Sequence, residues 1–488
     1  MLVNLINKEL RAIILSPKFI GTFTICSILI LISLIMGINE FRSAAERYNS
    51  ATQLAEADIQ EATSWGRIDT KVYRAPDPLQ IFASGLDYDI GRWSAISNEA
   101  SAKLRNSAYS EDTIFAIFRF IDFAFIVQFI LTLFALLFTY DAINGEREDG
   151  TLKLVFSYPV SRAKYLIAKS AGAWMGLVIP ISIPILLGLL LILFYGIPLS
   201  ADHWIRIGIF LLLSLGLFTF FIIFGVFISA VTKYPSVSFL ISLVCWLLFV
   251  LIIPRAGVMA AGHLVHVPRV AEIEGQINSF SIEQWKEFED KMSVGWNSAE
   301  SESNMPEEPS DEALWAMMEK HDSARKVVEQ DIIDYDIKVH NDLVQRKKRQ
   351  EKVAFGLTRI SPASAFQLGA MTLAGTDINM KMRYEESMNS YRNEFYNFVE
   401  QKQEETGDNG RIMMAITIDD DGNQNIATTG NRSDDNKLDL SELPRYAPPS
   451  ATLSESLSPV IINIGLIALY TILSFMGAFI AFVRYDVR

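Results

Sequence analysis

The sequence predicts an all-α polytopic membrane protein with six transmembrane helices and a mainly helical extracytoplasmic domain that carries a small β-hairpin. Half of the 488 residues are hydrophobic. Several segments of twenty or more residues are almost wholly apolar, and they alternate with charged segments. A helix needs about 20 apolar residues to cross a hydrocarbon core roughly 30 Å thick. The positive charges beside these stretches also fall on one face, as six crossings require.

Six stretches are apolar over a spanning length, and a helix satisfies their backbone groups internally, as lipid demands. They are Phe19–Ile38, Ala116–Tyr140, Leu166–Tyr195, Ile205–Val231, Ser238–Gly262 and Pro459–Val483. The second contains Arg119 and Asp122 near its outer end, where charges facing lipid are costly. These two residues are therefore candidates for a polar path. The alternative is that both reach the head-group layer or pair with external residues.

Orientation follows from lysine and arginine in the short loops. Basic residues precede the first stretch, lie between the second and third and between the fourth and fifth, and end the chain, whereas the connection 198–203 has none. Both termini are therefore predicted to be cytoplasmic, with a cytoplasmic segment at 1–18, another at 141–165 and a tail at 484–488. Segments 39–115 and 263–457 are predicted to be periplasmic or extracellular.

Both external segments contain helical patterns. Residues 41–63 are rich in Ala and Glu, 311–349 lack Gly and Pro, and 384–403 form a charged stretch with clustered aromatic residues. Two short strands, Met413–Ile418 and Gln424–Thr429, flank an acidic turn and predict a β-hairpin. We expect a helical hairpin with a small mixed lobe in the larger segment.

Several functions are excluded or disfavoured. The net charge of −13 argues against nucleic acid as a partner. The chain lacks GxxxxGK[ST], HExxH, GxSxG and CxxC, so it has no P-loop of its own, and we expect no catalytic or cofactor-binding residue. No metal site is expected either: the histidines at 263, 266, 321 and 340 lack further clustered ligands, and the acidic turn at 419–422 fails the calcium-loop pattern.

The segment from Asp141 to Arg162 carries the most chemical information. A dense run of mixed charge, Glu146–Asp149, precedes Gly150, which is expected to break the helix. An apolar patch of Leu152, Leu154, Val155 and Phe156 follows, and Pro159 breaks the chain again. Such a short, charge-laced element suits docking into a cleft on a soluble partner. An ordinary charged loop is the alternative, which composition alone does not reject.

The motif Gly145-Glu-Arg-Glu-x-Gly-Thr-Leu-Lys153, followed by Ser157-Tyr-Pro-Val-Ser-Arg162, resembles the signature of type-2 ABC exporter permeases. The amphipathic segment Leu2–Leu15 resembles that family's interfacial connecting helix. Further stretches are similar to an uncharacterised branch with a large external insertion, related to nitrous-oxide-reductase maturation and gliding-motility permeases. These stretches are 360–366, 374–377, 391–400, 443–446 and 484–487. The resemblance covers nearly the whole chain.

This resemblance implies type-2 ABC exporter architecture and a permease subunit in the bacterial inner membrane. Residues 141–165 would form the coupling element on a separate ATPase: Glu146, Arg147 and Glu148 would make polar contacts. Gly150 and Thr151 would shape the turn, Leu152 would belong to the apolar patch, and Arg162 would hold the exit of the element. The chain itself would not be an enzyme.

The implied partners are two ABC ATPase subunits that bind ATP and Mg, and a second permease copy or a sister permease. The lipid bilayer and a periplasmic partner complete the set, with no nucleic acid. The implied function is coupling of ATP hydrolysis to export of an unknown substrate or to movement of the external domains. The alternative is a non-transporting membrane scaffold or mechanotransmission protein whose external helices bind an envelope partner.

Overall fold

The computed structural model describes residues 2–65, 68–87, 90–97, 102, 104, 122–301, 311–406, 413–418, 424–429, 438–450 and 452–484. It divides into two compact units, one formed by Met1–Leu251 with Ser361–Arg488 and the other by Ile252–Ile360. The predicted second span begins at residue 116, so its first part, including Arg119, lies outside the described residues.

Six helices in the described part of the chain are long and apolar enough to cross a membrane. This number confirms the predicted fold class of a multi-pass, all-α membrane protein. The six spans are α2 (Pro17–Gln60), Phe123–Glu148, α8 (Arg162–Phe194), α9 (Ala201–Val231), Pro235–Leu264 and α16 (Leu453–Arg484). Two of the spans contain a π-helical turn. In the second span, η4 (Ile126–Leu131) lies between α4 (Phe123–Phe125) and α5 (Thr132–Thr139). In the fifth span, η5 (Leu248–Ile252) lies between α10 (Pro235–Leu247) and α11 (Ile253–Leu264).

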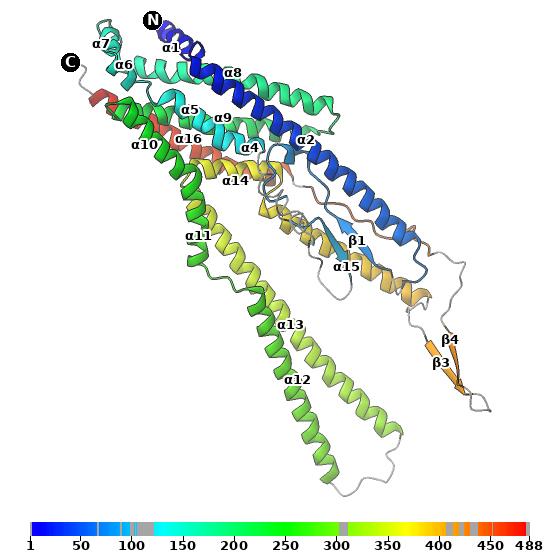
Figure 1. Ribbon diagram of the computed structural model, residues 1–488. Helices are drawn as coiled ribbons and strands as arrows, with labels where there is room; N and C mark the ends of the chain where they lie inside the picture. Colours follow the sequence, from blue (N-terminus) through cyan, green and yellow to red (C-terminus); the bar gives the residue numbers. More distant parts are fainter. Residues whose placement is uncertain are drawn as a thin grey trace. The chain divides into compact units, whose positions relative to one another are not determined.

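The first span continues far beyond its apolar part. The predicted span 19–38 and the predicted external helix 41–63 belong to one helix of 44 residues, α2 (Figure 1). The residues after 38 are rich in Ala, Glu and Gln, which favour helix, so nothing interrupts it there. At 1.5 Å per residue, α2 is about 66 Å long. It therefore runs without a break from the first span into a separate lobe, described below, that contains its last residues.

α9 lies at the centre of the larger unit, where it contacts α5, α8, α10, α14 and α16. Its residues Leu217, Phe221 and Ile222 are fully buried. Hydrogen bonds cross between neighbouring apolar helices: the Trp246 indole donates to the Thr132 hydroxyl at 2.8 Å, and the Trp174 indole donates to Thr219 at 2.9 Å. Such polar contacts hold helices together in lipid, where apolar burial alone gives little preference between partners.

The predicted external segment 263–457 is divided between the two units. Residues 361–374 return to the larger unit, where α14 (Pro362–Ala374) contacts α9 and α16, with Phe366 fully buried. Ser361 caps the start of α14, and Gly375, with φ of +65°, ends it. The physical reason for the division is the composition of α14: its small and apolar residues suit a core rather than a water-exposed domain.

An outer lobe combines parts of both predicted external segments. It contains the end of α2, strands β1 (Thr70–Tyr73) and β2 (Trp93–Ile96), and α15 (Ile378–Thr406), around buried residues that include Met388 and Phe395. β1 and β2 pair antiparallel, with Thr70 opposite Ile96. The short helix η2 (Pro78–Ile81) lies between them in sequence. Strands of four residues give too weak an alternation to be predicted.

The second unit is a helical hairpin. α12 (Val270–Ser301) packs against α13 (Asp311–Thr358), and the rings of Phe280 and Tyr335 stack with centroids 4.0 Å apart. α11 packs against the end of α13 at Gly257.

The predicted β-hairpin, which belongs to the larger unit, is confirmed, since β3 (Met413–Ile418) and β4 (Gln424–Thr429) pair antiparallel.

A substitution in α9 tests the packing of the larger unit. A Cβ atom on Gly225 would overlap the Thr139 hydroxyl of α5, whereas a Cβ on Gly208 of the same helix meets nothing. We expect Gly225→Ala to lower the free energy of unfolding by about 1–3 kcal/mol, the usual cost of overpacking. Gly208→Ala gives the same gain in helix propensity and is the control. Thermal unfolding of the detergent-solubilised protein measures both, and equal midpoints would contradict the close α5–α9 contact.

Candidate functional site

A compact polar element joins the second and third spans. It consists of α6 (Asn144–Glu148) and α7 (Thr151–Phe156), separated by Gly150 with φ of +71°. This left-handed conformation suits glycine, because other residues carry a Cβ that is strained there. The Thr151 hydroxyl donates to the Glu146 carbonyl at 3.1 Å across the turn. The element lies at the same end of the bundle as α1 (Leu2–Ile14) and the last turn of α16, here called the terminal end (Figure 1).

Asn144 fixes this element to the end of α9. Its side chain is fully buried and donates to the Thr232 hydroxyl at 2.9 Å, while the Ser229 hydroxyl donates to its Oδ1 at 3.1 Å. The backbone amide of Ile143 donates to the same Ser229 oxygen at 2.9 Å. Reasoning from sequence missed Asn144, because one asparagine in a polar run carries no sign of its partners.

Glu146 is at the centre of a charge cluster formed by Lys8, Glu9, Glu146, Tyr165 and Lys169. Its Oε1 lies 2.6 Å from Lys8 Nζ and 3.0 Å from Lys169 Nζ, and its Oε2 accepts from the Tyr165 hydroxyl at 2.6 Å. Lys169 also pairs with Glu9 at 2.9 Å. The two lysines balance the two glutamates, and only Lys8 is substantially exposed. The cluster therefore joins α1, α6 and α8 through one carboxylate.

The charge cluster raises the pKa of the Lys8 ammonium group. Burial lowers the pKa of its ammonium group, but the hydrogen bond and charge of Glu146 outweigh that effect, so the pKa lies above its ordinary value. The lysine is therefore charged at neutral pH, as the ion pair requires.

Two glycines allow α1 and α8 to approach closely. A Cβ atom on Gly172 would lie 2.5 Å from the Glu9 side chain, and one on Gly176 would lie 3.4 Å from Ile13. Small residues four positions apart let helix backbones come together. This contact sets Glu9 beside Lys169, so the backbone approach and the charge cluster support one another.

The inner side of α7 is apolar and buried. Leu152 is 2% exposed and belongs to a cluster with Tyr165 and Phe482, whose rings stack 5.2 Å apart. The Arg162 guanidinium donates to the carbonyl of Phe482 at 3.3 Å and also to that of Val483, at the end of α16. A cation is favourable at a helix C-terminus, where carbonyls lack helical partners. The element is thereby attached to α16 as well.

The outer side of the element is exposed and mixed in character. Leu154 and Tyr158 are 67% and 66% exposed, and the charged residues Glu148, Asp149 and Lys153, close to them in sequence, are exposed too. We call these five residues the docking face. Of the predicted apolar patch, Leu154 lies on this face, Leu152 is buried, and Val155 and Phe156 are half-buried. Tyr158 belongs to the motif 157–162 that resembles the permease signature, but no feature of the sequence predicted that its side chain is exposed.

The three residues predicted to make polar contacts to an ATPase, Glu146, Arg147 and Glu148, differ in their exposure. Glu146 is held by three partners inside this chain, Arg147 is half-buried, and Glu148 is exposed. Which of them contacts an ATPase stays a prediction.

Asp122 lies at the other end of the bundle and caps α4. Its carboxylate accepts from the Phe125 amide at 2.7 Å, and from the amide and hydroxyl of Ser84 at 2.9 and 2.8 Å. It thus joins the loop after η2 to the start of the second span. A role of Asp122 in a polar path stays a prediction.

No group of three metal-ligating side chains occurs among the described residues.

Six apolar helices of spanning length, with a polar element fixed at the terminal end, define a multi-pass membrane protein. The sequence model described as "ABC-2 family transporter protein" matches residues 3–487, and the chain belongs to this family.

Two relatives are both described as "Probable ABC transporter permease protein NosY". The protein from Stutzerimonas stutzeri is 34% identical over 133 residues, which is 26% of this chain and 47% of the relative. The protein from Pseudomonas aeruginosa is 47% identical over 47 residues, 10% of this chain and 17% of the relative. The chain thus spans about half the length of the first of these relatives and less of the second.

Removal of the Glu146 charge tests the cluster. Glu146→Gln leaves Lys8 and Lys169 with one carboxylate between them. We expect a loss of about 2–3 kcal/mol in unfolding free energy, less than the roughly 3–5 for a fully buried pair, because Lys8 is half-exposed. Glu148→Gln, an exposed neighbour, is the control and should change stability by less than about 0.5 kcal/mol. Thermal unfolding in detergent measures both; a stable Glu146→Gln variant would contradict the central place of this carboxylate.

Proposed function

We propose that this chain is the membrane-spanning permease subunit of an ATP-driven transporter and that its docking face binds a separate ATPase subunit. The observation that carries the proposal is the two-sided construction of α6, α7 and the turn that follows α7. One side is fixed inside the protein by Asn144, Glu146 and Leu152, while Leu154 and Tyr158 point outward. A fixed element that exposes apolar residues together with charged residues suits a protein interface.

The charges of the docking face would orient the partner, and the apolar side chains would supply affinity. Full burial of Leu154 or Tyr158 would contribute about 1.5–3 kcal/mol each. Glu148, Asp149 and Lys153 would lie at the rim, where charges affect register and association rate more than affinity. ATP and Mg would be bound by the ATPase, and this chain would bind neither.

Movement of the partner would reach the rest of the chain through the charge cluster. A displacement of α6 would act on α1 through Lys8 and on α8 through Lys169. α1 is followed by α2 after a short turn at Ser16, so the displacement would continue along that helix to the outer lobe. Two ATPase subunits, with a second copy of this chain or a sister permease, would complete the complex.

The proposed orientation places the terminal end and both termini in the cytoplasm of a bacterial cell, with the chain in the inner membrane. The outer lobe and the α12–α13 hairpin would be periplasmic or extracellular. Lysine and arginine in the loops of the terminal end support this orientation. The substrate would be exported or acted on from that outer side.

A second candidate function is favoured by the continuity of α2. A helix about 66 Å long with no break joins the first span to the outer lobe and would transmit force as well as gate a path. The chain would then be a mechanotransmission protein or scaffold whose external helices bind an envelope partner. Transport measured after reconstitution separates the two, because only the first candidate requires net movement of a substrate.

The docking face is tested by charge introduced at its apolar residues. We expect Leu154→Asp and Tyr158→Asp each to weaken binding of the cognate ATPase at least tenfold, since about 1.4 kcal/mol corresponds to a factor of ten. The measurement is the affinity of purified permease for purified ATPase, with stimulation of ATP hydrolysis as a second readout.

The matched control is Leu54→Asp. Leu54 is 66% exposed on α2, nearly the same exposure as Leu154, but lies outside the terminal end. It should leave ATPase binding unchanged. Equal affinities for wild-type protein and both docking-face variants, with each variant folded, would refute the assignment of this surface.

A further inference from the structure

A cavity lies in the outer lobe between α2 and the β1–β2 hairpin. Its volume is ≈190 Å³, which is room for a group as small as a phosphate or carboxylate. Three arginines line it: Arg47 from α2, Arg74 directly after β1, and Arg92 directly before β2. Three guanidinium groups at one small cavity are costly unless anions compensate them.

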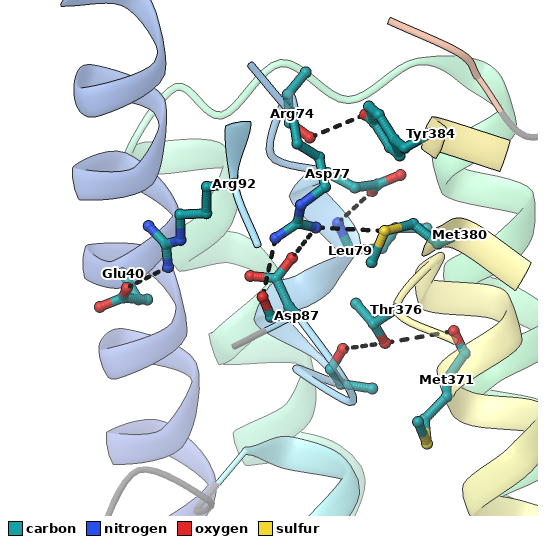
Figure 2. Close-up of polar contacts among 12 residues, drawn as sticks. Glu40, Arg74, Asp77, Leu79, Asp87, Arg92, Met371, Thr376, Met380 and Tyr384 are labelled. Atoms are coloured by element: carbon teal, nitrogen blue, oxygen red, sulfur yellow. Dashed lines mark hydrogen bonds and ion pairs between the residues drawn. The ribbon is translucent and has the colours of Figure 1, made fainter. Parts of the chain in front are cut away.

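Among the described residues, two carboxylates, Asp87 and Glu40, form ion pairs with these arginines. Asp87 belongs to Arg74: its Oδ1 lies 2.5 Å from Nη1, and its carbonyl accepts from Nη2 at 2.9 Å. Glu40 is shared, since its Oε1 lies 3.2 Å from an Nη of Arg47 and 3.9 Å from one of Arg92. Figure 2 shows Arg74 directed to Asp87 and Arg92 directed to Glu40. Among the described residues, three guanidinium groups therefore share two carboxylates.

Polar atoms in the cavity wall lack partners among the described residues. The Arg74 side chain is 6% exposed, yet its Nε donates to nothing, and the Nε of Arg92 is buried in the same way. Gln80, which is 8% exposed, has an unpartnered Oε1. Buried donors and acceptors are almost always satisfied in folded proteins. Among the described residues, two N–H groups and one amide oxygen on the side chains that line the cavity are therefore unsatisfied.

The electrostatic environment of Arg92 agrees with this excess of positive charge. Burial lowers the pKa of its guanidinium group, and the charges of Arg47 and Arg74 lower it further, against the raising effects of Asp87 and Glu40. A bound anion would relieve both the repulsion and the loss of hydration.

We propose that this cavity binds a small oxyanion, a carboxylate or phosphate group, at the guanidinium groups of the arginines that line it, Arg47, Arg74 and Arg92. Tyr48, Tyr73 and Trp93 in the wall supply a surface for an attached organic group. The site is independent of the docking face and of any ATPase.

Position along α2 favours a soluble ligand over a lipid head group. Arg47 is nine residues beyond Ile38, the end of the predicted first span, or about 13 Å at 1.5 Å per residue. The head-group layer extends only about 5–7 Å beyond the hydrocarbon on each side. Because both sources present the same chemistry, the experiment treats them in separate arms.

The test measures the thermal stability of the full-length chain against inorganic phosphate and acetate, with ionic strength held constant by chloride. We expect a saturable rise in the unfolding midpoint for wild-type protein with at least one of the two anions. In Arg92→Gln the apparent Kd should be at least tenfold weaker. Arg47→Gln, at a half-exposed position, gives a second variant if Arg92→Gln fails to fold. Arg346→Gln, which removes an exposed charge on α13, is the control and should bind as wild type does.

A second arm compares nanodiscs of phosphatidylcholine with nanodiscs that contain phosphatidylglycerol. Stabilisation by phosphatidylglycerol that Arg92→Gln abolishes, without any effect of free anions, would assign the oxyanion to a lipid. The proposal is overturned if neither phosphate, acetate nor phosphatidylglycerol stabilises wild-type protein. It is also overturned if Arg92→Gln and Arg47→Gln respond as wild type does.

Discussion

The arrangement of the terminal end depends on the ion pairs that Glu146 makes with Lys8 and Lys169. These residues come from three separate elements, α6, α1 and α8, and each would leave a poorly compensated charge if its element shifted. Because an unpaired charge away from water is costly, the cluster restricts the three elements to one register. The ion pair of Lys169 with Glu9 and the close approach of α1 to α8 at Gly172 belong to the same register.

Features that depend on local composition were predictable from the sequence. Six spans follow from hydropathy alone, since crossing lipid requires only length and apolarity. The strands at 413–418 and 424–429 and the helix beginning at Asp311 are likewise properties of short windows. In the site, the positive φ of Gly150 follows the same logic, because a glycine between a charged and an apolar turn is itself a local signal.

Features that depend on distant partners were not predictable. Leu152 and Leu154 are equivalent in the sequence, and only the packing of α7 against Phe482 makes one buried and the other exposed. Glu146 was recognisable as a charge in a motif, but its partners Lys8 and Lys169 are set by the α1–α8 contact. α14 has 13 residues, too few to span a membrane, so no periodicity shows that it returns to the core.

The exposure of Leu154 and Tyr158 has a consequence for how long an unassembled subunit would survive in the cell. A contiguous apolar patch that faces water marks an interaction site, and proteins that expose one without its partner are removed by chaperones and proteases. Under the proposed assignment, a copy synthesised without its ATPase would display this surface to cytoplasmic quality control. Assembly would then set abundance: unpaired subunits would be degraded, and the stoichiometry of the complex would be maintained without matched rates of synthesis.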